Sequence, residues 1–255
     1  MTRCVGHRGA AGLAPENSLA AFRAGIAAGA DAVECDVHQT RDGYLVLMHD
    51  ADVNRTTDGT GQIGAMLLAD LQHLNCAAKF GDGVSAPQHV PRLEDLLDLA
   101  AGQCAVQVEI KVPRPRAYAG IELQVVTALR EHTMIDGAQV ICFDAQTLAR
   151  VHAIEPRLAL GFLGSASSLP AFLRSDAVAL VAHAEGCGAG FLGLDREYVR
   201  AEHLRAARAR GLALGVWTVN DALEMESLID WGVDAVTSDR PDILRRVLDD
   251  SARTH

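Results

Sequence analysis

Several properties that would place this chain in other classes are missing from its 255 residues. No apolar run approaches the roughly 20 residues that span a bilayer, and aromatic residues make up only 4%. Lysine occurs only as Lys79 and Lys111, and the formal net charge is −10. Because nucleic acids and anionic membranes attract basic surfaces, we expect no nucleic-acid partner and no stable membrane association.

Closely spaced cysteines are also missing. The six cysteines are spread along the chain without a C-x-x-C pair. We therefore expect small buried core residues in a reducing compartment rather than a disulfide framework or a zinc site. The first expected strand begins by Arg3, which leaves no room for a signal peptide and favours a cytoplasmic location.

The chain does contain a regular alternation of strand-like and helix-like segments. Strands are expected at residues 4–7, 32–37, 104–110, 138–143, 158–162, 190–194, 212–216 and 234–237. A helical apolar stripe follows each of them, which predicts a (β/α)8 or TIM barrel. An open doubly wound sheet is disfavoured because no G-x-G-x-x-G follows the first strand.

The expected domain organisation is one TIM-barrel domain over residues 1–255. The length, with 49% hydrophobic residues, suits a single large core. Residues 51–91 are rich in turn formers and contain one short helical piece. We expect them to form a small insertion over the barrel mouth, too small for a core of its own.

Residues 32–50 are expected to form a hairpin that carries several candidate functional residues. Alternate strand side chains share a face, so Glu34 and Asp36 point the same way. The short connection, with a tight turn at residues 41–43, permits only antiparallel pairing. If the turn centres near Arg41 and Asp42, His49 lies level with Glu34.

Polar residues collect where the expected strands end, and in a TIM barrel these carboxyl ends form the active-site face. Glu109 and Lys111 have the same i, i+2 spacing as Glu34 and Asp36. The strand-end residues are His7, Arg8, Glu34, Asp36, Glu109, Lys111, Trp217, Asn220, Ser238 and Asp239.

These residue types together indicate phosphodiester cleavage. Three carboxylates suit one divalent cation, Mg²⁺ or Ca²⁺, better than zinc. Two imidazoles supply a general base and a general acid, and two cationic side chains hold an anion. The candidate metal ligands are Glu34, Asp36 and Glu109; the candidate catalytic pair is His7 and His49; the candidate substrate-binding residues are Arg8, Lys111 and Trp217.

A set of motifs resembles the glycerophosphodiester phosphodiesterases. They are HRG (7–9), APENSLAAF (14–22), GADAVECDVHQTRDG (29–43), HD (49–50), RTTDGTG (55–61), VPRLEDLL (90–97), VEIK (108–111), VWTVN (216–220) and SDRP (238–241). The resemblance runs from the first strand to the last helix in the family's order. It implies a TIM barrel with a small insertion after the HD pair and hydrolysis of glycerophosphodiesters to glycerol 3-phosphate and an alcohol.

The same resemblance implies roles for individual residues. The family's metal ligands fall on Glu34, Asp36 and Glu109, its acid/base pair on His7 and His49, and its phosphate contacts on Arg8 and Lys111. Apart from the resemblance, Trp217 is expected either to contact the glycerol or to plug the top of the barrel. His38, Asp50, Asn220 and Asp239 are expected to support the site, and Glu16 and Asn17 to cap a helix and fix a loop. Cys142 and Arg92 depart from the family's pattern and are candidates for lining the mouth.

Other interpretations of the sequence remain open. In one alternative, the substrate is a lysophospholipid or sphingomyelin. In another, the chain is a non-catalytic barrel that binds phosphate metabolites. An amidohydrolase is disfavoured because His7-Arg8-Gly9 replaces the His-x-His of that class. Left undecided are the alcohol preference, the ion, which histidine is the base, direct water attack or a cyclic phosphate, and whether the chain is a monomer or homodimer.

Overall fold

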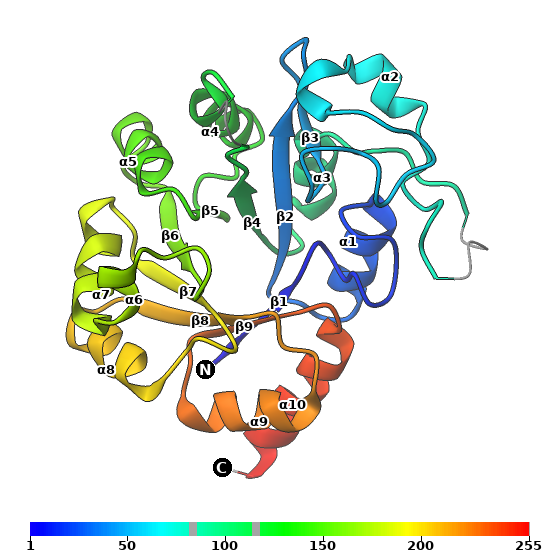
Figure 1. Cartoon of the computed structure of the whole chain (residues 1–255). Coiled ribbons are helices and arrows are strands. Elements are labelled where there is room, and N and C mark those ends of the chain that lie inside the picture. The colour runs from blue at the N-terminus through cyan, green and yellow to red at the C-terminus, as the bar shows by residue number, and fades with distance from the viewer. Residues whose placement is uncertain (82–85, 114–117, 255) are drawn as a thin grey trace.

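The strands close into a parallel barrel in the computed structural model, which describes residues 1–81, 86–113 and 118–254. Within these residues the barrel has eight strands, and β1 pairs with both β9 and β2, which closes the ring (Figure 1). The strands are β1 (Arg3–Gly6), β2 (Ala32–Gln39), β4 (Ala105–Ile110), β5 (Ala138–Cys142), β6 (Ala159–Gly164), β7 (Phe191–Asp195), β8 (Ala213–Trp217) and β9 (Ala235–Ser238). The predicted TIM barrel is confirmed.

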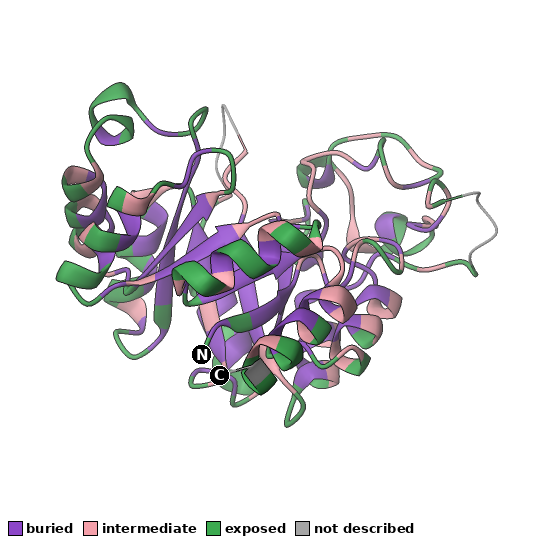
Figure 2. Ribbon diagram, turned by 90° about the horizontal axis from the view of Figure 1, so that it is seen from below, coloured by how far each residue is buried: buried purple, intermediate pink, exposed green. Residues whose placement is uncertain are grey.

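Helices surround the barrel and cover its outer face (Figure 1). They are α1 (Leu19–Ala27), α3 (Leu93–Ala100), α4 (Ile121–Glu131), α5 (Ala145–Ile154), α6 (Ala171–Arg174), α7 (Ala177–Gly186), α8 (Ala201–Ala209), α9 (Ala222–Trp231) and α10 (Pro241–Thr254). Figure 2 shows buried residues concentrated in the strands and exposed ones along the outer helix faces. No helix in the described ranges has the length and apolar character needed to cross a bilayer.

Local sequence explains where several helices begin. Ser18 caps α1 because its side chain accepts a hydrogen bond from the Ala21 amide. Asp144 caps α5 in the same way, by accepting from the Thr147 amide. Two helices, α6 and α7, lie between β6 and β7. Asp176 ends the continuity because its side chain caps α7.

The two faces of each strand have different surroundings, as the side-chain alternation predicts. In β2, Val33, Cys35 and Val37 join the large apolar core between barrel and helices, while Glu34 and Asp36 take the alternate positions. The six cysteines are free; Cys104 is half-buried and the others are buried, which confirms the expectation of core cysteines.

A single aromatic side chain closes the floor of the barrel. Phe191 of β7 is 9% exposed and packs with Val5, Ala32 and Ala235 at the amino end of the barrel. It fits because the neighbouring strand β8 carries Gly215, where an added Cβ would collide with the Phe191 ring. The barrel interior below the carboxyl end is therefore packed.

The hairpin forms as expected, but its register differs by one residue. β3 (Leu45–Leu47) pairs antiparallel with β2, with Val37 opposite Leu47. The turn is a three-residue loop that ends on Gly43 in the left-handed region at φ 88°, so its centre is Asp42. The predicted pairing of His49 with Glu34 is not formed, because β3 and its register with β2 end at Leu47 and His49 lies beyond them.

The insertion packs onto the hairpin. It contains the short 3-10 helix η1 (Ile63–Ala65) and α2 (Leu68–Gln72), and residues 82–85 of it lie outside the described residues. Its small apolar cluster consists of Val46, Met48, Val53, Ile63, Leu71, Cys76 and Val90. Val46 and Met48 belong to the hairpin, so residues outside the insertion complete the cluster. Figure 1 shows the insertion beside β2, β3 and α1.

Replacing His203 with glutamine should reduce the loss of stability at acid pH. His203 is buried, and its Nδ1 accepts a hydrogen bond from the Arg200 amide, 2.9 Å away, at the start of α8. Burial lowers the pKa of His203, so as the pH falls below about 6.5 the unfolded chain takes up a proton first and stability decreases. Glutamine accepts the same bond without titrating.

Urea unfolding at about pH 7 and about pH 5 measures this effect, because these values flank the ordinary histidine pKa. We expect the acid loss of His203→Gln to be smaller than that of the wild type by about 1 kcal/mol. Equal losses in both proteins would contradict the prediction.

Candidate active site

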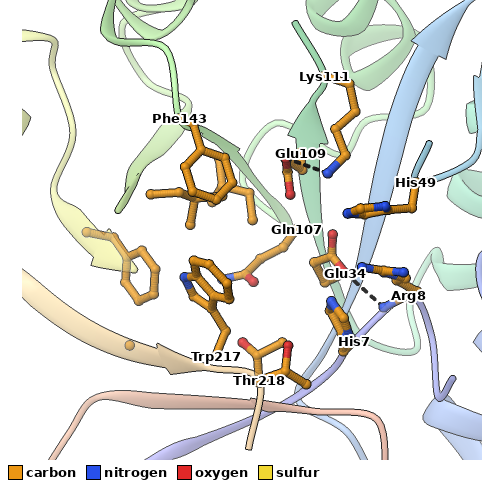
Figure 3. Close-up of a pocket in the computed structure, with 15 residues that line it drawn as sticks. His7, Arg8, Glu34, His49, Gln107, Glu109, Lys111, Phe143, Trp217 and Thr218 are labelled. Atoms are coloured by element: carbon orange, nitrogen blue, oxygen red, sulfur yellow. Dashed lines mark hydrogen bonds and ion pairs between the residues drawn. The ribbon is translucent and has the colours of Figure 1, made fainter. Parts of the chain in front are cut away.

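One pocket at the carboxyl ends of the strands collects seven of the eight candidate residues (Figure 3). Its charged lining consists of His7, Arg8, Glu34, His49, Glu109 and Lys111. Its apolar lining includes Ile141, Phe143, Leu163, Phe191 and Trp217. Asp36, the eighth residue, is 1% exposed and lies behind the lining, in contact with Lys111. The pocket therefore has a charged half over β1, β2 and β4 and an apolar half over β5 to β8.

The acidic cluster follows from the strand register. β2 and β4 are parallel neighbours, with Glu34 beside Gln107 and Asp36 beside Glu109. One carboxylate oxygen from each of Glu34, Asp36 and Glu109 lies within 4.8 Å of the others. The three side chains are almost entirely withdrawn from solvent, at 3%, 1% and 9% exposed.

Two cationic side chains contact this cluster. Lys111 Nζ lies 2.8 Å from Asp36 Oδ1 and 2.7 Å from Glu109 Oε1, and Arg8 Nε lies 3.5 Å from Asp36 Oδ2. The Arg8 amide also donates to Glu34 Oε2 at 2.8 Å, an orientation that accompanies the left-handed φ of 48° at Arg8. Three carboxylates against two cations leave one negative charge without a partner when all are ionised.

The unbalanced charge appears in the pKa values. Burial, with the charges of Asp36 and Glu109, raises the pKa of Glu34 well above its ordinary value. Burial also raises the pKa of Glu109, to about 7, although Lys111 opposes the shift. Burial disfavours ionisation of Asp36 too, but Lys111 and Arg8 outweigh it and hold the pKa of Asp36 low.

The donor set fits a divalent cation. All three ligands are carboxylate oxygens, which hard cations such as Mg²⁺ and Ca²⁺ prefer. A bound cation would also neutralise the excess negative charge that raises the pKa of Glu34 and Glu109. The cluster is consistent with the expected divalent cation.

His7 is held by a carboxylate at one ring nitrogen. Its Nδ1 lies 2.6 Å from Asp239 Oδ1, and Asn220 Nδ2 donates to the other oxygen of Asp239 at 2.6 Å. Because an ionised carboxylate only accepts hydrogen bonds, Nδ1 carries the proton and Nε2 is left for the pocket. Asn220 and Asp239 thus support the site, as predicted.

His49, which follows β3, has the same arrangement. Its Nδ1 lies 2.7 Å from Asp50 Oδ1, and its backbone oxygen lies 3.2 Å from Nε2 of His38. Tyr118 Oη lies 2.8 Å from the other ring nitrogen of His38. Burial and the charge of Lys111 lower the pKa of His49. Figure 3 shows both His7 and His49 at the cavity that also contains Glu34.

Asn17 does more than the loop-fixing role predicted for it. Its Nδ2 donates to Asp36 Oδ2 at 2.7 Å, and its Oδ1 accepts from the Asp36 amide at 3.2 Å. This pair orients a candidate metal ligand. The helix cap itself is Ser18.

Gln107 was missed by the sequence analysis. It lines the pocket, and its amide donates to Gln139 at 2.7 Å. The signal was present, because Gln107 precedes Glu109 by two residues and so shares its strand face.

The two departures from the family pattern do not line the pocket. Cys142 is 1% exposed and belongs to the apolar core, because the alternate residues Ile141 and Phe143 of the same segment face the pocket. Arg92 precedes α3 and pairs with Asp95 at 3.3 Å. The expectation is wrong for Cys142, and Arg92 is not among the residues that line the pocket.

The fold and the pocket define a class first. The chain is a TIM barrel whose carboxyl-end pocket combines a buried carboxylate cluster with two histidines and two cationic side chains. TIM-barrel enzymes place their active sites on this face.

Comparison with known proteins identifies the family. Residues 7–243 match the Glycerophosphoryl diester phosphodiesterase family. The chain is 31% identical over 256 residues to the glycerophosphodiester phosphodiesterase of Bacillus subtilis, covering 95% of this chain and 85% of the relative. It is 31% identical over 247 residues to that of Caldanaerobacter subterraneus, covering 95% and 96%.

Solved structures agree. The crystal structure of glycerophosphodiester phosphodiesterase from Agrobacterium tumefaciens is 27% identical with a TM-score of 0.80, covering 96% of this chain and 99% of that one. An Oleispira antarctica phosphodiesterase in complex with the product sn-glycerol-3-phosphate is 26% identical with a TM-score of 0.83, covering 98% and 97%. The chain therefore belongs to the glycerophosphoryl diester phosphodiesterase family, and the predicted enzyme class is confirmed.

Replacing Glu34 with glutamine should stabilise the protein when no divalent ion is present. Because the pKa of Glu34 is raised in the folded state, stability is lost as the pH rises from the ordinary carboxyl pKa towards the folded one. Glutamine removes the charge and can still accept from the Arg8 amide. In excess chelator near neutral pH, we expect Glu34→Gln to gain about 0.5–2 kcal/mol in urea unfolding.

Added Mg²⁺ or Ca²⁺ should then stabilise the wild type and leave the variant nearly unchanged. Glu122→Gln is the matched control, because Glu122 is a buried carboxylate whose partner is Arg150, at 2.6 Å, and its replacement should destabilise. A Glu34→Gln protein less stable than the wild type in chelator would contradict the prediction.

Proposed function

We propose that the chain hydrolyses glycerophosphodiesters to glycerol 3-phosphate and an alcohol, with one divalent cation and the pair His7 and His49. The observation that carries this proposal is the shared geometry of the two histidines. Each has its Nδ1 held by a carboxylate, Asp239 or Asp50, and both line the pocket of the acidic cluster. The family membership and the glycerol 3-phosphate bound in the Oleispira relative support the substrate class.

The charged half of the pocket is assigned to the phosphate and the ion. Glu34, Asp36 and Glu109 would hold the cation, which supplies charge neutralisation at the phosphate oxygens when bound. Arg8 and Lys111 lie against the same carboxylates and are assigned to the non-bridging oxygens of the phosphate.

The histidines divide the proton transfers. In each ring the carboxylate-bound Nδ1 leaves Nε2 as the atom that exchanges a proton with the substrate. One histidine removes the proton of the nucleophile, and the other protonates the departing alcohol oxygen. The nucleophile is either water or the glycerol 2-hydroxyl, which would give a cyclic phosphate that water then opens. A phosphorus NMR time course distinguishes these routes.

The apolar half is assigned to the organic part of the substrate. Trp217 and Phe143 meet edge to face, with ring centroids 5.7 Å apart. Trp217 Nε1 is buried and has no hydrogen-bond partner among the described residues. Since buried donors are normally paired, we assign this N–H to a hydroxyl of the glycerol.

The reaction is tested by glycerol 3-phosphate release from glycerophosphocholine. Metal-stripped protein should be inactive and should recover with Mg²⁺ or Ca²⁺. His7→Gln and His49→Gln should each lose about 10²–10⁴-fold in kcat, the usual contribution of general acid–base catalysis. His132→Gln is the control, because His132 ends α4 and does not line the pocket.

Two results would overturn the proposal. One is wild-type protein that hydrolyses no glycerophosphodiester with any ion. The other is a His132→Gln variant as defective as the two pocket variants. Faster turnover of a lysophospholipid would retain the chemistry and change the substrate.

Trp217→Phe tests the assigned N–H donor. Phenylalanine keeps an aromatic wall and removes only the donor, so KM for glycerophosphocholine should rise about 3–10-fold, the value of one neutral hydrogen bond. The control is Trp231→Phe on α9, which changes the other tryptophan. A KM equal to that of the control would show that Nε1 does not contact the substrate.

A further inference from the structure

Arg55, a residue of the insertion, binds two carboxylates with all three of its guanidinium nitrogens. Its Nε donates to Asp50 Oδ2 at 2.6 Å. Its two terminal nitrogens donate to the two oxygens of Glu16, at 2.8 and 2.7 Å. Such a planar fork fixes the orientation of both carboxylates, which a lysine ammonium does not do.

Each of these carboxylates holds a residue of the pocket. Asp50 presents its other oxygen to His49 Nδ1 at 2.7 Å. Glu16 Oε1 accepts from a terminal nitrogen of Arg8 at 2.8 Å. A continuous path of hydrogen bonds therefore runs from His49 through Asp50, Arg55 and Glu16 to Arg8, from the end of the hairpin to the loop after β1.

Stability alone does not account for this arrangement. The Arg55 side chain is 46% exposed, and ion pairs with that exposure contribute little to stability. The apolar cluster of the insertion already attaches it to the hairpin. What Arg55 adds is orientation, because Asp50 and Glu16 each have one partner in the pocket and one partner in Arg55.

The charge states of Glu16 and Asp50 also depend on Arg55. Burial disfavours ionisation of Glu16 and Asp50, but the hydrogen bonds from Arg55 hold the pKa of both carboxyls low. Asp50 thus stays a pure acceptor for the His49 N–H. Glu16 shares its charge between Arg8 and Arg55, and Arg8 Nε also lies 3.5 Å from Asp36.

We propose that Arg55 is a positioning residue through which the insertion sets the tautomer of His49 and the orientation of Arg8. This inference rests on the proposed function for its kinetic consequences and on the protein alone for its structural one. Arg55 acts through Asp50 on the proton-transfer step and through Glu16 on phosphate binding.

Kinetic measurements separate the effect of Arg55 through Asp50 from its effect through Glu16. Arg55→Gln should lower kcat/KM for glycerophosphocholine by about 10–100-fold, as loss of a group that orients site residues does. In an Asp50→Asn background the same change should affect KM and leave kcat nearly unchanged. In a Glu16→Gln background it should affect kcat and leave KM nearly unchanged.

The matched control is Arg130→Gln. Arg130 is 45% exposed and pairs with the buried Glu155 through two nitrogens at 3.1 Å, away from the pocket. Arg130→Gln should lose stability as Arg55→Gln does. Its activity should stay within about twofold of the wild type, which is less than the change that loss of one typical hydrogen bond produces. Arg55→Lys keeps the charge without the fork and should fall between the wild type and Arg55→Gln.

A readout without turnover uses ion-free protein. Imidazole proton–nitrogen NMR at mildly alkaline pH reports which ring nitrogen of each histidine is protonated, and His49→Gln identifies the His49 signals by their loss. We expect the Nδ1-protonated form in the wild type and in Arg130→Gln, and a shift towards the Nε2-protonated form in Arg55→Gln. This result supports the inference even if the substrate class is wrong.

The inference is overturned by an unchanged His49 tautomer in folded Arg55→Gln. It is also overturned if Arg55→Gln affects kcat and KM equally in all three backgrounds, or no more than Arg130→Gln does. Arg55 then only attaches the insertion to the barrel. If Arg55→Gln does not fold, the Arg55→Lys spectra and kinetics decide by the same criteria.

Discussion

Three buried carboxylates on the neighbouring strands β2 and β4 are the constraint around which this molecule is arranged. Like charges this close, at 9% exposure or less, repel each other and lose their hydration. Lys111 and Arg8 offset part of that cost, and Asn17 satisfies one oxygen of Asp36. The segments that supply these partners, after β1, before α1 and after β4, are therefore held in one place by the cluster.

The barrel makes such a site possible because its core lies elsewhere. Apolar strand residues fill the space against the helices, and Phe191 fills the floor over Gly215. The carboxyl-end pocket is left to polar groups on one side and aromatic groups on the other. This division suits a substrate that combines a charged phosphate diester with an organic arm.

The insertion contributes to the site from outside the barrel. It has a small apolar cluster that the hairpin completes, and its polar contacts reach the loop after β1 through Glu16. A carboxylate holds each histidine. Asp239, which follows the last barrel strand, holds His7. Asp50, which Arg55 of the insertion binds, holds His49. The two histidines thus follow β1 and β3, while part of their orientation comes from loops.

The sequence by itself determined the strand and helix order, the barrel and the carboxylate cluster. It did so because side-chain period is local: Glu34 and Asp36, like Glu109 and Lys111, share a face whatever surrounds them. Tertiary structure alone decided the contacts between distant segments, such as His7 with Asp239 and Asn17 with Asp36. It also decided the register of the hairpin, because one residue in a turn moves every later paired residue by one position.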